Sequence, residues 1–400
     1  MEYATISLAV KIQLTKTKTI EVKFPGGSSK STWAKADLTG VELCSGESRG
    51  APAVRIAHKK DGWHVLAAGF VPPPNGELPE RWEDTPHQPV WELPRDFQSP
   101  AAAIAVNSSM GSFGQASAEA IIHEMTHGLD ANRKDSSSAQ KPRLGVKRQP
   151  QSSEAPAPAA PSRKVVLPSP GIPVSENGRR FTIKPFAEAG FHLAASLPEF
   201  QALWLSRLLP EGRRPTATSI QLADSALMAS VLLQPEFLAS DGNALAILVR
   251  RDAVYFAGYK KGAPVLWRRC PGVRGYAAMR EAVCKGLGVG EDLVDSVLED
   301  SLVDPRPALE PFLQPVMEQL DLARAYLAGK HSLKTDRAIL LGLPCGAGHW
   351  RHVAEESIKM QFVAADPFDG FKIGKGVDVT DGHLLLVALG AAIAASEVKS

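Results

Sequence analysis

The sequence predicts an α/β protein built from two similar lobes, and three observations lead to this prediction. The chain has 400 residues, which is more than one hydrophobic core usually serves. A segment near residue 53 is repeated near residue 253. In both halves of the chain, short apolar stretches with the period of strands alternate with segments that have the period of amphipathic helices.

The repeat consists of the segments 53–66 and 253–266, which align without a gap. Each segment has the pattern of strand, lysine-rich turn, strand. An apolar stretch precedes each of them, at 40–44 and at 244–249, so each copy predicts a three-stranded antiparallel meander. The alternative is a chance likeness between two ordinary hairpins. The identical pairs are Ala53/Ala253, Val54/Val254, Ala57/Ala257, Lys60/Lys260, Gly62/Gly262, Val65/Val265 and Leu66/Leu266.

Helices and single strands are expected after each meander, as in an α/β lobe. In the first half we expect a strand at 101–107, a helix at 116–129, a strand region at 181–193, a helix at 198–209, a strand at 219–222 and a helix at 224–233. In the second half we expect helices at 275–288 and 308–327, a strand at 338–341, a helix near 352–360, a strand at 361–364 and a buried helix at 384–395.

A segment of different composition interrupts the first half. Residues 132–175 are dominated by Ser, Pro, Ala, Lys, Arg and Gln, so they cannot bury enough apolar surface to offset the entropy of ordering. We therefore predict a disordered insertion. Its basic excess suits an acidic lipid or partner, and a solvated linker is the alternative. The predicted organisation is a first lobe at 1–131, the insertion at 132–175, the remainder of the first lobe at 176–240, and a second lobe at 241–400 whose last helix packs across the lobes.

Charge and cysteine content exclude several classes of protein. The 45 basic and 43 acidic residues give a net charge of +2, which offers no electrostatic basis for a dedicated nucleic-acid binder. The N-terminus lacks the pattern of a signal peptide, and the apolar run 384–395 is shorter than a membrane span requires. We expect a cytoplasmic protein. The cysteines are far apart and form no CxxC pair, which argues against a zinc knuckle or a disulfide framework: Cys44, Cys270, Cys284 and Cys345.

One motif indicates a different class of protein. His123-Glu-Met-Thr-His127 matches the HExxH pattern, in which two histidines one helical turn apart hold zinc while Glu124 activates water. A zinc metalloprotease also needs a third ligand, and only distant residues such as Glu176 or Glu188 are available. The alternative is an amphipathic helix with exposed histidines, and we expect no catalytic metal site.

A family resemblance enters at the C-terminal end. The segments Ala364-Ala-Asp-Pro-Phe-Asp-Gly-Phe371 and Leu384-Leu-Leu-Val-Ala-Leu-Gly-Ala-Ala-Ile393 resemble the Asn/Asp-Pro-Phe segment and the closing Ala/Gly-rich helix of the PilM family. PilM proteins are cytoplasmic actin-like components of type IV pilus assembly platforms, and they are related to the cytoplasmic domain of the type II secretion protein GspL. The likeness covers residues 40–395 and is weak between 70 and 180. It implies a duplicated actin-like fold of the ribonuclease H type.

The resemblance also implies where a nucleotide would bind. Actin-like proteins hold ATP and magnesium between the lobes, with one hairpin turn of each lobe near the phosphates and a Gly-rich loop near the adenosine. Here the strand 244–249 before the second turn carries no carboxylate, so magnesium lacks its second anchor. Strand-to-helix turns explain the glycines equally well. We expect a degenerate site that performs no hydrolysis, and its candidate residues are Glu42, Ser45, Gly46, Ser48, Gly346 and Gly348.

The remaining use of such a fold is to hold partners. The PilM resemblance implies a cytoplasmic scaffold, peripheral to the inner membrane, that captures the cytoplasmic tail of a bitopic membrane protein. It also allows self-association into homo-oligomers. Three functions stay open at this point: the scaffold with a pseudo-ATPase site, an active ATP-binding protein of the PilM type, and a zinc metalloprotease.

Overall fold

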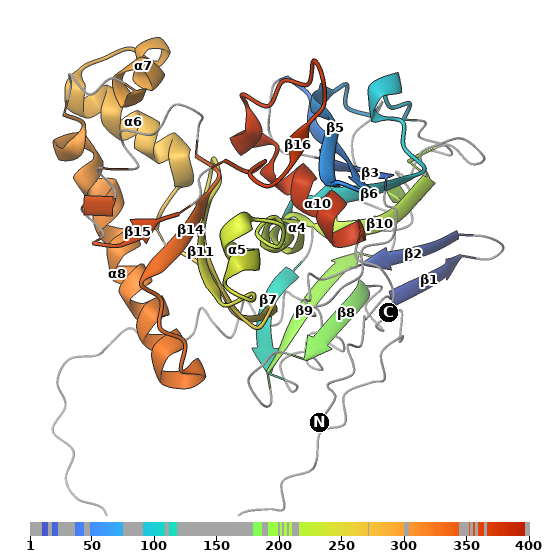
Figure 1. The fold of residues 1–400 in the computed structure, drawn as a ribbon, viewed down its shortest axis with the longest axis horizontal. Coiled ribbons are helices and arrows are strands. Elements are labelled where there is room, and N and C mark those ends of the chain that lie inside the picture. The colour runs from blue at the N-terminus through green and yellow to red at the C-terminus, as the bar shows by residue number, and fades with distance from the viewer. Residues whose placement is uncertain are drawn as a thin grey trace, which may run out of the picture.

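The structure, a computed structural model, describes most of both lobes. Figure 1 draws the other residues as a thin grey trace. For 10–14, 18–22, 112–117, 179–185, 191–196, 216–218, 295 and 298–299 only the backbone is described. The described residues are 10–14, 18–22, 37–43, 49–74, 91–108, 112–117, 179–185, 191–198, 201, 204–205, 208–209, 216–270, 272–299, 304–343, 352, 355–356, 359–363 and 366–396.

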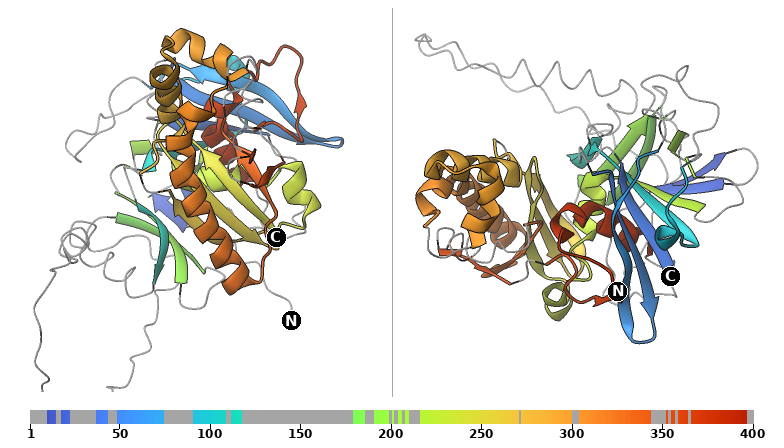
Figure 2. Two further views of the ribbon diagram at one scale, coloured as in Figure 1. Left: turned by 90° about the vertical axis from the view of Figure 1, so that its left-hand side faces the viewer. Right: turned by 90° about the horizontal axis from the view of Figure 1, so that it is seen from above.

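The described elements include two large sheets with helices between them, and a third, smaller sheet (Figures 1 and 2). The helices α4, α5 and α10 lie between the sheets, and α6 and α8 cover the outer face of the second sheet. One apolar core joins the inner face of the second sheet to α4, α5, α10 and the first sheet, and a second core lies under α6 and α8. The helices are α4 Ala223–Ala229, α5 Pro235–Ala239, α6 Gly275–Leu287, α7 Val294–Glu299, α8 Arg306–His331 and α10 Leu386–Ser396. Short 3-10 turns are η2 Arg95–Phe97, η4 Glu291–Leu293 and η5 Gly382–Leu384.

The larger sheet, among the described residues, has the order β1-β2-β10-β6-β3-β4-β5-β16. Its centre is an antiparallel meander, β3-β4-β5, followed by the parallel strands β6 and β10 on the other side of β3. The strands are β1 Val10–Leu14, β2 Lys18–Val22, β3 Asp37–Leu43, β4 Ala51–Lys59, β5 Gly62–Val71, β6 Ala101–Val106, β10 Thr216–Leu222 and β16 Lys372–Ile373.

The second sheet repeats this plan. Its described order is β13-β12-β11-β14-β15, an antiparallel meander followed by two parallel strands beside the first strand of the meander. Both sheets therefore place their strands in the order third, second, first, fourth, fifth, as expected of a duplicated unit. The strands are β11 Ala244–Val249, β12 Val254–Lys260, β13 Ala263–Arg269, β14 Arg337–Leu341 and β15 Gln361–Phe362.

The two repeat segments occupy equivalent hairpins, but their alignment is shifted at the turn. Lys59 pairs with Gly62 across the first turn, whereas Lys260 pairs with Ala263 across the second. Gly62 therefore opens a strand while Gly262 lies in the turn, although the gapless alignment equates them. Each turn has two residues between the paired strand ends, 60–61 in the first hairpin and 261–262 in the second, so the second turn lies one residue later in the gapless alignment.

A third, smaller sheet lies between β6 and β10 in the chain. It has the order β7-β9-β8, from β7 Ser112–Ser117, β8 Arg179–Pro185 and β9 Phe191–Pro198. The helix that we expected from residue 116 is wrong at its start, because β7 pairs with β9 as far as Ser117. The rest of that expected helix, with the HExxH motif, and the insertion at 132–175 lie outside the described residues.

The last helix, α10, returns to the first lobe. It is buried against β3 and α4, and two glycines permit this close approach. A Cβ atom on Gly40 would lie 1.9 Å from the Ala388 carbonyl oxygen, and one on Gly390 would lie 1.9 Å from the Ala226 carbonyl oxygen. The chain from 366 onward, which the predicted organisation assigned to a second lobe whose last helix packs across the lobes, thus contacts the first sheet through β16 and α10. Among the described residues, no helix is both long and apolar enough to cross a membrane.

Candidate functional site

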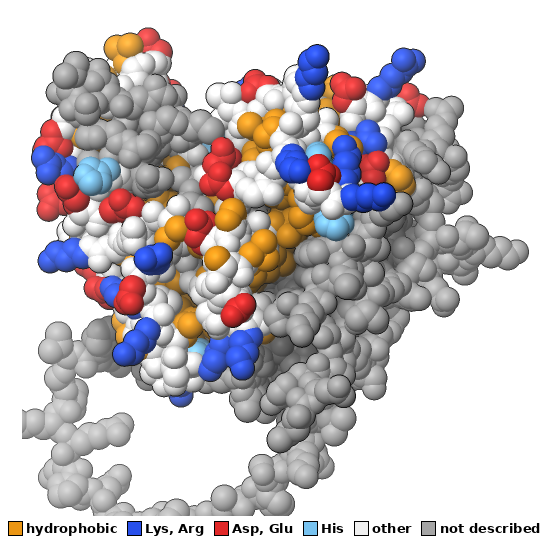
Figure 3. All heavy atoms as spheres, in the orientation of Figure 1, with side chains coloured by type: hydrophobic (Ala, Val, Ile, Leu, Met, Phe, Trp, Pro, Cys, Tyr) orange, Lys and Arg blue, Asp and Glu red, His pale blue; other side chains and the backbone are white. Residues whose placement is uncertain are grey.

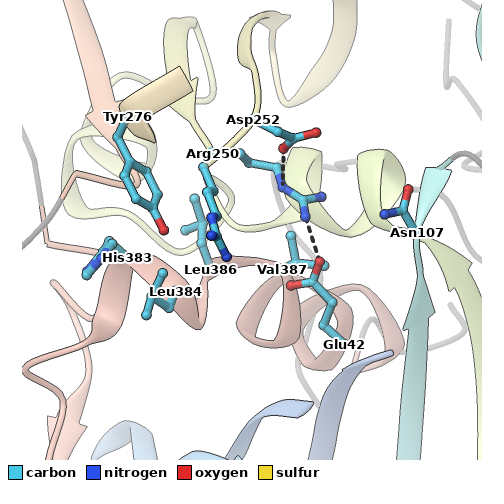
Figure 4. A pocket seen from close by; sticks show the side chains of 10 residues that line it. Glu42, Asn107, Arg250, Asp252, Tyr276, His383, Leu384, Leu386 and Val387 are labelled. Atoms are coloured by element: carbon cyan, nitrogen blue, oxygen red, sulfur yellow. Dashed lines mark hydrogen bonds and ion pairs between the residues drawn. The ribbon is translucent and has the colours of Figure 1, made fainter. Parts of the chain in front are cut away.

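An open cavity of about 320 Å³ lies between the lobes, where the central strands of both sheets end. Glu42 comes from the end of β3, Asn107 follows β6, and Arg250 follows β11. The start of α10 and the turn before it close the floor of the cavity (Figure 4). Its lining residues are Glu42, Asn107, Arg250, Arg251, Asp252, Tyr276, His383, Leu384, Leu386 and Val387.

An ion pair joins the two lobes inside this cavity. The Arg250 guanidinium donates to a carboxylate oxygen of Glu42 at 2.7 Å, and the side chains are 16% and 3% exposed, respectively. Figure 4 shows the arginine side chain lying between Glu42 and Asp252. Burial alone would lower the pKa of Arg250, yet nearby Glu42 and Asp252 raise it, so the guanidinium stays charged. A buried charge pair of this kind needs close geometry to offset the loss of hydration.

A second carboxyl group stands behind the pair, on the first turn of α4. Burial raises the pKa of Asp224, while hydrogen bonds from Ser108 and Tyr255 and the charge of Arg250 oppose the shift. Tyr255 belongs to β12 of the second lobe, so this contact also crosses between the lobes. Burial, followed by the charge of Asp224, raises the pKa of Tyr255 above its usual range. Both groups therefore favour their neutral forms more than they would in water.

The rim of the cavity is tied to the C-terminal segment. Arg49 forms an ion pair with Asp381 at 2.6 Å and lies 4.2 Å from the centre of the Phe70 ring. The rings of Tyr276 and His383 meet edge to face at 5.4 Å. Arg49, just before β4, and the start of α6 are thereby linked to the segment before α10.

Of the six predicted nucleotide residues, the structure describes Glu42. The other five, Ser45, Gly46, Ser48, Gly346 and Gly348, lie outside the described residues. Glu42 lines the cavity, and its carboxylate accepts a hydrogen bond from a guanidinium; its predicted role at a nucleotide stays a prediction. Sequence reasoning missed Arg250 because only the packing of the two lobes brings it within reach of Glu42. The available signal was its position directly after strand 244–249, at the turn equivalent to the one after Glu42.

The nearby Gly342 shows why a glycine ends β14. Its φ is 91°, and a Cβ atom there would lie 1.9 Å from the Val249 carbonyl oxygen. The end of β14 can thus approach the end of β11 closely. The positive φ and the close approach to the Val249 carbonyl therefore account for Gly342, the first glycine of the Gly-rich loop.

The described residues of the cavity fit a magnesium nucleotide poorly. Glu42 is held by Arg250, and Asp252 lies 3.9 Å from Arg250 and 4.0 Å from Arg269, so a divalent cation at either carboxylate would face a guanidinium. Within the described part of the chain, no cluster of His, Cys, Asp or Glu could hold a metal ion. His123, Glu124 and His127 lie outside it.

Comparisons with known proteins place the fold. No protein-family model and no curated protein matches the sequence. A chain of the structure of the PilM-PilN type IV pilus biogenesis complex aligns with a TM-score of 0.52 at 12% identity, covering 91% of this chain and all of that one. A protein of actin-like ATPase fold from Bacteroides thetaiotaomicron aligns with a TM-score of 0.34 at 11% identity, over 90% of this chain and 99% of its own.

A third structure is the cytoplasmic domain of EpsL, an inner-membrane component of the type II secretion system of Vibrio cholerae. It aligns with a TM-score of 0.26 at 9% identity, over 67% of this chain and 77% of its own. The match to the PilM-PilN structure, together with the repeated strand order, confirms the predicted fold class: α/β, duplicated, actin-like. The likeness to PilM expected from the C-terminal motifs is therefore present at the level of the fold.

Proposed function

We propose that this protein is a cytoplasmic scaffold of a type IV pilus or type II secretion-like assembly platform at the inner membrane. In this role it binds the cytoplasmic tail of a bitopic membrane protein and catalyses no reaction. The observation that carries the proposal is the alignment of nearly the whole fold with a chain of a PilM-PilN complex. The motifs at 364–371 and 384–393 support the same family independently of the fold.

The charges in the cleft favour a scaffold over an ATPase. ATP hydrolysis in this fold needs magnesium and phosphates between the lobes, and neither is strongly attracted by a site whose charges are already paired. Glu42 neutralises Arg250 within the protein, so neither side chain offers an unbalanced charge to a ligand. The proposed pseudo-ATPase would keep the two-lobe shape and use its surface for binding.

The surface offers apolar area for a partner. On the face seen in Figure 3, apolar side chains gather in the band between the lobes. Leu238 of α5 is 59% exposed, which is high for a large apolar side chain. A short tail gains affinity by burying a few apolar anchors in such a surface. The same property permits homo-oligomers as a second use of this surface.

The direct test is binding of isolated tails. Synthetic peptides of the cytoplasmic tails of all bitopic proteins encoded beside this gene are labelled and titrated with the full chain in a fluorescence anisotropy assay. Scrambled peptides of the same composition serve as controls. We expect saturable binding of one native tail and none of its scrambled form. If every native tail behaves like its scrambled control, the scaffold proposal is wrong.

Two rival functions have separate tests. A thermal-shift experiment with ATP and magnesium should give no shift, because we expect no nucleotide to bind. The assay is sensitive enough to decide, since a ligand that binds at a hundred times its dissociation constant adds about 2.7 kcal/mol of stability. A large shift would favour the active ATP-binding alternative. Elemental analysis for zinc, with a His123→Ala control, addresses the metalloprotease. If the parent chain binds one zinc ion and the variant binds none, the metalloprotease function is supported and the scaffold proposal is wrong.

A further inference from the structure

The ion pair between Glu42 and Arg250 joins the two lobes across the cleft, so a movement of one lobe relative to the other changes its length. Glu42 is the last residue but one of β3, the first strand of the first meander, and Arg250 directly follows β11, the first strand of the second meander. The two strands belong to different sheets, so the 2.7 Å contact spans the cleft (Figure 4). A rotation that widened the cleft by a few ångströms would break it.

The turn that carries Arg250 is fixed by its own backbone. The N–H of Arg250 donates to the Ala253 carbonyl at 2.8 Å, and its carbonyl accepts from the Tyr276 N–H at 2.9 Å. Gly275 makes this contact possible, since a Cβ atom there would lie 1.9 Å from the Arg250 oxygen. Arg250 is thus anchored to both β12 and α6. Arg250 therefore moves together with the second lobe.

Further contacts between the lobes lie in the apolar core between the sheets. Tyr259 of β12 donates from its hydroxyl to the Met228 carbonyl of α4 at 2.6 Å, and its ring meets Phe237 of α5 edge to face at 5.1 Å. These groups belong to the apolar core between the sheets. Apolar contact is not directional and tolerates small rotations, whereas a buried ion pair is lost when its atoms separate. The apolar core between the sheets therefore joins the lobes but does not by itself fix the width of the cleft.

We propose that Glu42 and Arg250 form an internal clamp that holds the two lobes at one separation without any ligand. In this arrangement the Glu42 carboxylate serves as the anion that Arg250 would otherwise take from a bound molecule. The clamp rests on the proposed function in one respect, because it explains how a scaffold keeps its lobes closed when the nucleotide site is degenerate. The mechanical statement about the free protein does not depend on the partner.

The test measures the distribution of distances between the lobes in the full chain. Spin labels are attached through non-natural residues at the exposed Lys60, in the β4–β5 turn, and Lys330, near the end of α8, which leaves the cysteines unchanged. Pulsed dipolar spectroscopy should give one narrow distribution for the otherwise unaltered chain. In Glu42→Gln, which keeps the shape of the side chain and removes its charge, the width should at least double. Width equal to that of the parent chain overturns the clamp.

Matched variants separate the clamp from general effects. Glu281 forms an ion pair with Arg274 at 2.6 Å on the surface of α6, so Glu281→Gln makes the same chemical change outside the cleft and should leave the width unchanged. If Glu42→Gln does not fold because Arg250 is left unpaired, Glu42→Gln/Arg250→Met removes both charges and should fold with a broad distribution. A narrow distribution in this double variant also overturns the clamp. Failure of tail binding with a normal clamp result would reject only the proposed function.

Discussion

The packing of α10 on α4 makes a sharp prediction at Gly390. Replacing it by alanine adds a Cβ atom that would lie 1.9 Å from the Ala226 carbonyl oxygen, 2.7 Å from its carbon and 3.2 Å from the Ser230 nitrogen. The neighbours are backbone atoms of a helix, so they cannot rotate away as a side chain could. The two helices must instead separate by roughly 1 Å to restore a normal contact, and such a gap forfeits a quarter to a half of the attraction between the facing atoms.

The expected magnitude follows from two opposing effects. Forcing an extra group into a well-packed core costs about 1–3 kcal/mol, and contact with backbone lies at the upper end. Alanine is favoured over glycine inside a helix by about 1 kcal/mol. The net loss for Gly390→Ala should therefore be about 2 kcal/mol. For a chain of 400 residues that unfolds as one unit, this corresponds to a fall in melting temperature of roughly 2–3 °C.

Gly329→Ala is the matched control. Gly329 also lies in a helix, α8, but a Cβ atom there would meet no atom within 4 Å. This variant should be as stable as the parent chain or more stable by up to about 1 kcal/mol. Urea unfolding followed by circular dichroism measures both variants. A Gly390→Ala variant that unfolds at the same urea concentration as Gly329→Ala would refute the close packing of α10 on α4.

Three further predictions concern stability. Leu320→Ala should lower the free energy of unfolding by about 2–5 kcal/mol because Leu320 is 1% exposed. Leu322→Ala on the same helix should change it by less than about 0.5 kcal/mol because Leu322 is 52% exposed. Urea unfolding measures both variants. Tyr259→Phe removes the buried hydrogen bond to the Met228 carbonyl and should cost about 1–2 kcal/mol, and a variant with an unchanged urea midpoint would contradict this contact. Asp224→Asn should stabilise the fold at neutral pH but not at pH 3. Burial raises the pKa of the Asp224 carboxyl in the folded state, so the destabilisation caused by its negative charge is full above the folded pKa and absent below the unfolded pKa. Melting temperatures of the variant and the parent chain across this pH range decide the sign.

The candidate site was only partly accessible from the sequence. Glu42 could be singled out because it ends an apolar strand before a Gly-containing turn, as the resemblance required. Arg250 could not be assigned a partner, since 208 residues separate it from Glu42 and both charged side chains look like ordinary turn residues in the sequence. Whether an ion pair forms depends on distances of a few ångströms, which local patterns do not encode.

Local periodicity and internal repetition determined the elements themselves. Strand 244–249 was predicted to the residue, and α8 was predicted from apolar residues that all prove buried: Leu309, Leu313, Val316, Leu320 and Ala323. The start of the expected helix at 116 was wrong because pairing with β9 extends β7 to Ser117, and a strand's partner lies outside any local window.

Sequence by itself thus determined that two copies of one α/β unit follow each other, because side-chain periodicity and repetition are properties of neighbouring residues. Tertiary structure decided where the copies meet. The return of α10 to the first lobe depends on glycines at 40 and 390 that allow backbones to touch, and the ion pair across the cleft joins one carboxylate to one guanidinium from residues 208 positions apart. Both are contacts between distant segments, whose energies exist only once the chain has folded.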